Sequence, residues 1–180
     1  MRSPRLLLVP LVAALVAAGA FAVPPMPVKK AVIVGASPAD VWAAWTTVAG
    51  AKAFFAPDAR IEAVPGGPYE IYLDPGAPEG SRGCEGCTVV SVEPPKKLVV
   101  TWSFPPSFPE LRAKGEMGRL SVELLPGSVE GSTLVSLVHD GFPEGGEGEK
   151  ARAYFEKAWD VVLGRLQQRF RSGSVDWSKR

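Results

Sequence analysis

Residues 149–171, "EKARAYFEKAWDVVLGRLQQRFR", decide the fold because their apolar side chains recur every three or four positions. This spacing matches the α-helical period and predicts one helix, about six turns long, with a broad apolar stripe. Charged residues occupy its other faces. Such a helix is stable mainly when its stripe packs against another layer. The stripe contains Ala151, Phe155, Ala158, Trp159, Val162, Leu163, Leu166 and Phe170.

The second layer is predicted from residues 59–140, which contain one strand-like segment after another. Alternation is clearest in residues 98–104, where Leu98, Val100, Trp102 and Phe104 share one face. Turn sequences separate the segments, such as Pro65-Gly66-Gly67. Short connections of this kind favour an antiparallel sheet whose neighbouring strands pair in chain order.

A strand over 28–34 and two short helices precede this meander. Ser37 is a good helix N-cap and Pro38 suits the first helical position, so the first helix follows directly. The second is predicted within 48–57 and ends before Pro57. Together these elements predict an α+β fold, in which a curved antiparallel sheet wraps around the long C-terminal helix. Where the sheet and the helix separate, an apolar cavity is expected.

The first 22 residues have the pattern of an export signal. Arg2 and Arg5 precede a short apolar run, and Ala20-Phe21-Ala22 fits a cleavage site. We therefore expect a signal peptide over 1–22, a linker over 23–27, one domain over 28–171 and a polar tail over 172–180. The mature protein would be secreted or periplasmic, and would meet a membrane only during export.

Charge and missing motifs argue against nucleic acid, cofactors and metals as partners. Without Arg2 and Arg5 the chain has 18 basic and 19 acidic residues, a formal charge of about −1. This balance gives no electrostatic reason to expect nucleic acid as a partner. The sequence contains no glycine-rich phosphate motif and no histidine cluster, so no cofactor and no metal are predicted. Protein partners are left open.

Cys84 and Cys87, in "GCEGC", are the only cysteines. Cys-x-x-Cys occurs in redox enzymes, but there the first cysteine usually begins a helix, whereas this motif enters a strand. Zinc needs about four ligands, and one histidine is all that remains. A local disulfide requires a bend at Gly86, because residues three apart in a strand lie roughly 10 Å apart. Either that bend exists or the pair is not bonded locally, and we predict the first, a local disulfide between Cys84 and Cys87 that acts as a structural clip at the rim of the expected cavity.

Several segments together resemble the SRPBCC (START-like, helix-grip) superfamily. They include "ASPADVWAAWTTVAGAKAFFAP", "PPKKLVVTWSF", "LVHDGFP" and "YFEKAWDVVLGRL", and the resemblance runs from about Val28 to Phe170. Within the superfamily they resemble the homologues of the activator of heat-shock-protein ATPase. This resemblance implies a deep pocket under the C-terminal helix for small or lipidic apolar molecules. The chaperone-activating role belongs to cytosolic relatives with an extra domain, and is not expected of an exported single-domain chain.

The candidate ligand-binding residues are large apolar side chains predicted to face that pocket, and Trp45, Phe54 and Phe55 are expected at its mouth. For each one, plain core packing is the alternative. As a group they would form a normal lining for an apolar ligand. The set is Trp45, Phe54, Tyr69, Trp102, Phe104, Leu120, Val122, His139, Phe155 and Trp159.

An enzyme of the same fold is the alternative function. His139, the only histidine, and Tyr69 are its weak acid–base candidates. A structural role for His139, hydrogen-bonding the loop at Gly141, is the competing interpretation. No nucleophile elbow of the Gly-x-Ser-x-Gly type occurs. The leading hypothesis is therefore an exported protein that binds a small hydrophobic ligand. A thiol–disulfide protein working through Cys84 and Cys87 is a third hypothesis.

Overall fold

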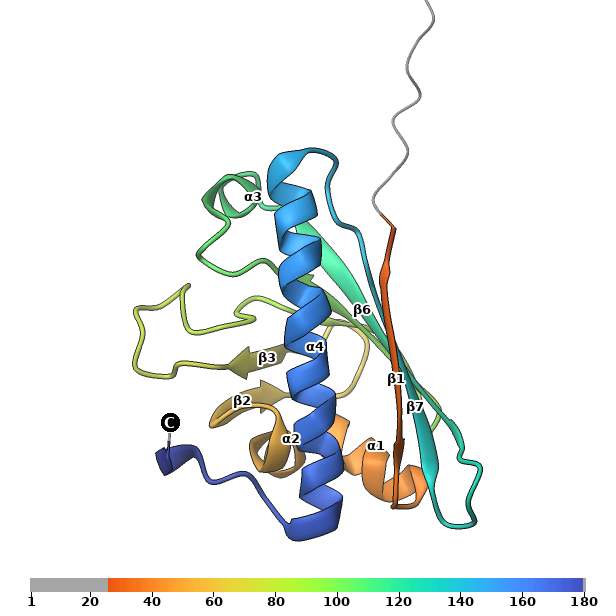
Figure 1. Cartoon of the computed structure of the whole chain (residues 1–180). Helices are drawn as coiled ribbons and strands as arrows, with labels where there is room; N and C mark the ends of the chain where they lie inside the picture. The colour runs from red at the N-terminus through yellow and green to blue at the C-terminus, as the bar shows by residue number, and fades with distance from the viewer. Residues whose placement is uncertain (1–25, 180) are drawn as a thin grey trace, which may run out of the picture.

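The computed structural model describes residues 26–179, so the predicted signal peptide and most of the linker lie outside the described residues. Figure 1 shows a curved sheet crossed by one long helix. In chain order the elements are β1 (Val28–Val34), α1 (Pro38–Thr46), α2 (Val48–Phe54), β2 (Asp58–Ile61), β3 (Tyr69–Tyr72), β4 (Val89–Glu93), β5 (Lys97–Ser103), α3 (Pro109–Ala113), β6 (Met117–Pro126), β7 (Thr133–Asp140), α4 (Gly146–Ser172) and the 3-10 helix η1 (Trp177–Lys179).

The main sheet has five antiparallel strands in the order β1-β7-β6-β5-β4. The predicted pairing in chain order holds from β4 to β7, but β1 pairs with β7, and Val28 lies opposite His139. The predicted hairpin of β2 and β3 forms a separate two-stranded sheet. Single bridges at Pro68 and Tyr72 connect it to the segment before β4. The bonds around the Pro68 bridge come from its neighbours, since the Tyr69 N–H donates to the Cys87 carbonyl and the Val89 N–H to the Gly67 carbonyl, both at 2.8 Å.

Helix α4 packs across the inner face of the main sheet, as the apolar stripe predicts. Most of the stripe is buried, whereas Ala158 and Phe170 at its edges are half-buried. The helix begins at Gly146, three residues before the predicted start. A carboxylate oxygen of Glu147 accepts a hydrogen bond from the Leu111 backbone N–H at 2.9 Å. This bond ties the start of α4 to α3.

Helices α1 and α2 close one end of the layer between sheet and helix. The Ser37 hydroxyl caps α1, because it accepts from the Asp40 N–H at 3.2 Å. Gly50 lets the two helices approach closely, since a Cβ there would lie 2.2 Å from the Ala43 carbonyl oxygen. The pair carries Phe54 and Phe55 into the core beneath α4.

The predicted polar tail folds back onto α2. The Val175 N–H donates to the Ala53 carbonyl at 2.9 Å, and the Trp177 indole donates to the Lys52 carbonyl at 2.6 Å. The Trp177 ring also meets the Arg165 guanidinium on α4, 5.4 Å from its centroid. Across residues 26–179, none of the helices has the length and apolar character that crossing a membrane requires.

Candidate functional site

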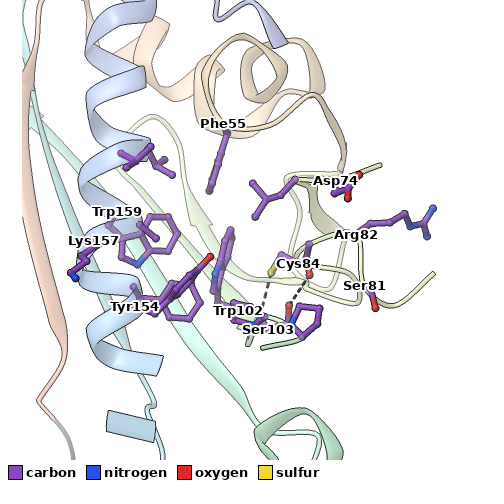
Figure 2. A pocket seen from close by; sticks show the side chains of 18 of the residues that line it. Phe55, Asp74, Ser81, Arg82, Cys84, Trp102, Ser103, Tyr154, Lys157 and Trp159 are labelled. Carbon is purple, nitrogen blue, oxygen red and sulfur yellow. Dashed lines mark hydrogen bonds between the residues drawn. The ribbon is translucent and has the colours of Figure 1, made fainter. Parts of the chain in front are cut away.

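A cavity of about 810 Å³ lies beside α4, between that helix, the end of β5 and the segment 73–84. Figure 2 shows the aromatic side chains from the helix and the sheet meeting on one side of it. The cavity opens to solvent, because Leu73, Tyr154 and Val161 on its edge are 42%, 43% and 50% exposed. Its volume falls within the range of ordinary small-molecule sites.

The floor of the cavity is aromatic. The ring centroids of Trp102 and Trp159 are 5.1 Å apart, and Phe55 stacks on Trp102 at 5.6 Å with an interplanar angle of 12°. Phe155 stacks on Trp159 at 6.0 Å. Flat, interlocked rings present a large apolar surface at little cost in side-chain entropy, and therefore suit an apolar ligand.

His139 holds Trp159 in place from below. Its Nδ1 accepts a hydrogen bond from the Trp159 indole N–H at 3.1 Å, and both residues are buried. Burial lowers the pKa of His139 to about 3, so the imidazole is neutral near pH 7. Because Nδ1 is the acceptor, Nε2 carries the proton. Among the described residues this Nε2 has no hydrogen-bond partner.

Gly118 on β6 provides the space for His139. A Cβ at Gly118 would lie 2.5 Å from Nε2 of His139 and 3.0 Å from the Asp140 carbonyl oxygen. The edge of the imidazole therefore packs directly on the backbone of β6. His139 thus lies below the cavity floor and is hydrogen-bonded to Trp159 on α4. Neither of the two roles predicted for His139 describes this position.

The opposite wall is the loop that contains the two cysteines. Gly86 has a φ of 74°, and the bend it makes brings the Cα atoms of Cys84 and Cys87 within 5.7 Å of each other. This separation lies in the range that a disulfide spans. The Ser103 N–H at the end of β5 points at both sulfur atoms, 3.4 Å from Cys84 Sγ and 3.3 Å from Cys87 Sγ. Cys84 lines the cavity.

Glu70 holds this loop from the neighbouring strand. One of its carboxylate oxygens accepts from the Gly86 N–H at 2.8 Å, and the other accepts from the Tyr72 hydroxyl at 2.7 Å. Alternation along β3 indicates a solvated side chain, but the Glu70 side chain is only 15% exposed. One of these partners, the Gly86 N–H, comes from a loop 16 residues away, and strand periodicity carries no information about it.

Three of the ten candidate ligand-binding residues line the cavity: Trp102, Phe155 and Trp159. The other seven are buried in the core and do not line it, because α4 packs closely on the inner face of the sheet. Trp45 and Phe54, expected at the mouth, lie in that core at 1% and 0% exposure. The remaining core members are Tyr69, Phe104, Leu120, Val122 and His139.

Residues that the sequence prediction missed form much of the cavity wall. Tyr154 lies on α4 beside the predicted stripe, four residues before Ala158, and Ala158 and Val162 belong to the stripe but were not predicted to line the cavity. The spacing of four is a detectable signal, since it places the three side chains on one face of the helix. Pro105 and Pro106 come from the loop after β5, where no periodic pattern applies.

The two acid–base candidates do not face the cavity. The Tyr69 hydroxyl donates to the Trp45 carbonyl at 2.9 Å, and burial raises the pKa of this phenol above its usual range. His139 lies behind Trp159. Over residues 26–179, no three His, Cys, Asp or Glu side chains are grouped closely enough to hold a metal ion.

Comparison with known proteins identifies relatives of this architecture. The sequence pattern of the family described as "Activator of Hsp90 ATPase homolog 1-like protein" matches residues 35–171. No curated protein sequence matches the chain significantly.

Solved structures show the same fold at low sequence identity. The Aha1 dimer from Colwellia psychrerythraea superposes with a TM-score of 0.61 at 21% identity, covering 83% of this chain and 98% of that one. PFC0360w, an HSP90 activator from Plasmodium falciparum, gives 0.56 at 18% identity, covering 79% and 94%. DynU16, from the dynemicin biosynthetic locus, gives 0.61 at 18% identity over 84% of this chain. This chain covers 49% of the length of DynU16, about half of it. The predicted helix-grip fold is confirmed by these structures.

Proposed function

The chain belongs to the family of proteins similar to the activator of Hsp90 ATPase homolog 1, within the SRPBCC (START-like, helix-grip) superfamily, and from this premise we propose that it is an exported protein that binds a small hydrophobic ligand. The observation that carries the proposal is the aromatic floor formed by Phe55, Trp102 and Trp159 in an open cavity of about 810 Å³. Such a surface is suited to exchange water for an apolar molecule.

The geometry favours binding over the alternative of catalysis through His139 and Tyr69. Both side chains are buried outside the cavity, with their bonded atoms turned to other core residues. A general acid or base must come within hydrogen-bond reach of the reacting group. From their present positions neither side chain can reach a molecule that rests on the aromatic floor.

Filling the cavity from α4 is expected to abolish binding of an apolar probe. Ala158 lines the cavity and is half-buried, so an Ala158→Trp side chain would occupy the space above the floor. We expect affinity for the neutral dye N-phenyl-1-naphthylamine, followed by its fluorescence, to fall more than about tenfold. A tenfold loss corresponds to only about 1.4 kcal/mol.

The matched control is Ala39→Trp, an exposed position on α1 that does not line the cavity. Circular dichroism and unfolding curves establish that both variants fold. Equal dye binding by the wild type and the folded Ala158→Trp variant would show that this cavity is not the site. Absence of dye binding by the wild type would count against the proposed function itself.

We propose further that Cys84 and Cys87 form a local disulfide in an oxidising compartment. The bend at Gly86 supports this pairing, and so does the N-terminal sequence pattern. Expressed in full in a bacterium with a periplasm, the protein is expected in the periplasmic fraction with a new N-terminus near Val23. After unfolding, its cysteines should react with a thiol reagent only if a reductant is added first.

Cys84→Ser serves as the control for reagent access, since its single remaining thiol should react without reductant. An uncleaved protein in the cytosolic fraction would contradict export. Two reactive thiols in the correctly exported, unreduced wild type would contradict the disulfide.

A further inference from the structure

The charged residues around the cavity are strongly biased toward one sign. Five charged side chains line it, and four of them are basic, with Asp74 the only acid. The described part of the chain, which lacks Arg2, Arg5 and Arg180, has 17 basic and 19 acidic residues. Arg82 is already ion-paired with Glu85, which does not line the cavity, but the other lining residues still carry a basic surplus within a slightly acidic molecule. The four basic residues are Arg82, Lys150, Lys157 and Arg165.

Two of the positive charges lie away from the aromatic floor. In Figure 2 the ends of Arg82 and Lys157 point outward on opposite sides of the view, whereas Trp102 and Trp159 lie between them. A ligand that satisfies both regions has an apolar body on the rings and a charged group near the solvent. In that position a charge meets several cations without losing all of its hydration, and so escapes the full desolvation cost.

Two of these cations are available to a ligand. Lys150 and Lys157 are exposed, and neither forms an ion pair or a hydrogen bond with any of the residues 26–179. Other lysines are already paired, such as Lys30 with Asp160 at 2.8 Å and Lys52 with Asp58 at 2.9 Å. Lys150 and Lys157 are two turns apart on α4, about 10 Å along its axis. Flexible lysine side chains can therefore converge on one group between them.

We propose that the ligand of this cavity is an apolar molecule with one anionic group, bound with its apolar body on the aromatic floor and its anion at the Lys150–Lys157 edge. The proposal rests on the proposed function, since it specifies the chemistry of the same ligand. A cationic amphiphile is not expected to bind, because the lysines repel it. A neutral molecule of the same shape is expected to bind more weakly than the anion.

Two dyes of nearly the same shape test the charge preference. The anion 8-anilinonaphthalene-1-sulfonate and the neutral N-phenyl-1-naphthylamine differ by the sulfonate group, and both become fluorescent in apolar sites. We expect the anion to bind about fivefold to tenfold more tightly at low ionic strength, as two partly exposed ion pairs would provide. Raising the salt from about 20 mM to about 500 mM should remove this preference and leave binding of the neutral dye unchanged.

The variant Lys150→Gln/Lys157→Gln should lose the preference for the anion and keep its affinity for the neutral dye. The matched control, Lys29→Gln/Lys114→Gln, removes the same charge at exposed positions outside the cavity and should behave as the wild type. Displacement of the neutral dye by dodecanoate or dodecyl phosphate at lower concentrations than by dodecanol would support the proposal and identify the preferred anion.

The outcomes separate this proposal from the proposed function. If neither dye binds, the proposed function fails. If the neutral dye binds and is blocked by Ala158→Trp, but the anion shows no preference or ignores the lysine substitutions, the binding function stands and the anionic ligand is wrong. Anion binding that survives Ala158→Trp would place the anion elsewhere and would equally overturn the proposal.

Discussion

Replacing Trp159 with alanine is expected to lower the free energy of unfolding by about 3–5 kcal/mol, as a large cavity in a packed core does. Trp159 is 1% exposed, and its ring contacts those of Phe55, Trp102 and Phe155. The substitution also removes the partner of His139, which leaves the buried Nδ1 without its donor. Binding of the neutral dye should fall with it, because the floor loses its central ring. Denaturant unfolding at pH 7 measures the stability change.

The variant Trp159→Phe distinguishes the contribution of the aromatic ring to stability from that of the indole N–H. Phenylalanine keeps most of the apolar contact but cannot donate to His139, so we expect a loss of about 1–3 kcal/mol. Dye binding should be largely retained. A Trp159→Ala variant that loses less than about 1 kcal/mol would contradict the packing described for α4.

Acidification is expected to destabilise the protein through His139, beginning near pH 6.5, above the range in which carboxylates titrate. Burial lowers the pKa of His139 to about 3, from an ordinary value of 6.5. The unfolded chain therefore takes up a proton below about pH 6.5, whereas the folded chain does not. The stabilisation is complete above pH 6.5 and is lost as the pH falls toward 3. The slope is about 1.4 kcal/mol per pH unit, and the loss between pH 7 and pH 4 is about 3 kcal/mol.

His139→Gln provides the comparison, since glutamine can accept from the Trp159 indole but does not titrate in this range. Unfolding curves of both proteins at pH 7, 6, 5 and 4 give a difference that isolates the histidine from the carboxylates. The wild-type advantage should shrink by about 3 kcal/mol across the series. A constant difference at every pH would mean that His139 is accessible to protons in the folded state.

The helix and the main sheet were predictable from sequence because each depends on a local period. The stripe of α4 and the alternation in β5 both report which side chains face the core. The separate β2–β3 sheet was not predictable in the same way. Its bridges to the segment before β4, at Pro68 and Tyr72, depend on where the intervening loop returns and not on a repeating pattern.

The candidate site was predicted only in part for a related reason. Burial and cavity lining give the same apolar signal, so periodicity grouped Phe104 and Leu120, which pack in the core, with Trp102, which borders open space. Distinguishing them requires knowing where α4 leaves the sheet. Ala158 and Tyr154 lie on the face of α4 that turns away from the sheet and borders the cavity. Likewise, nothing local links Gly118 to His139, which meet only because β6 lies beside β7.

The pairing of β1 with β7 has a consequence for how the chain reaches its final shape. The first strand to leave a ribosome or a translocation channel is completed by one that emerges more than a hundred residues later, as the Val28–His139 register shows. Until that late strand appears, β1 has no neighbour, and the main sheet cannot close. Long-range pairing of this kind delays folding. If the chain is exported as proposed, this delay would leave it unfolded, and so able to pass through a translocation channel, until most of it has been made.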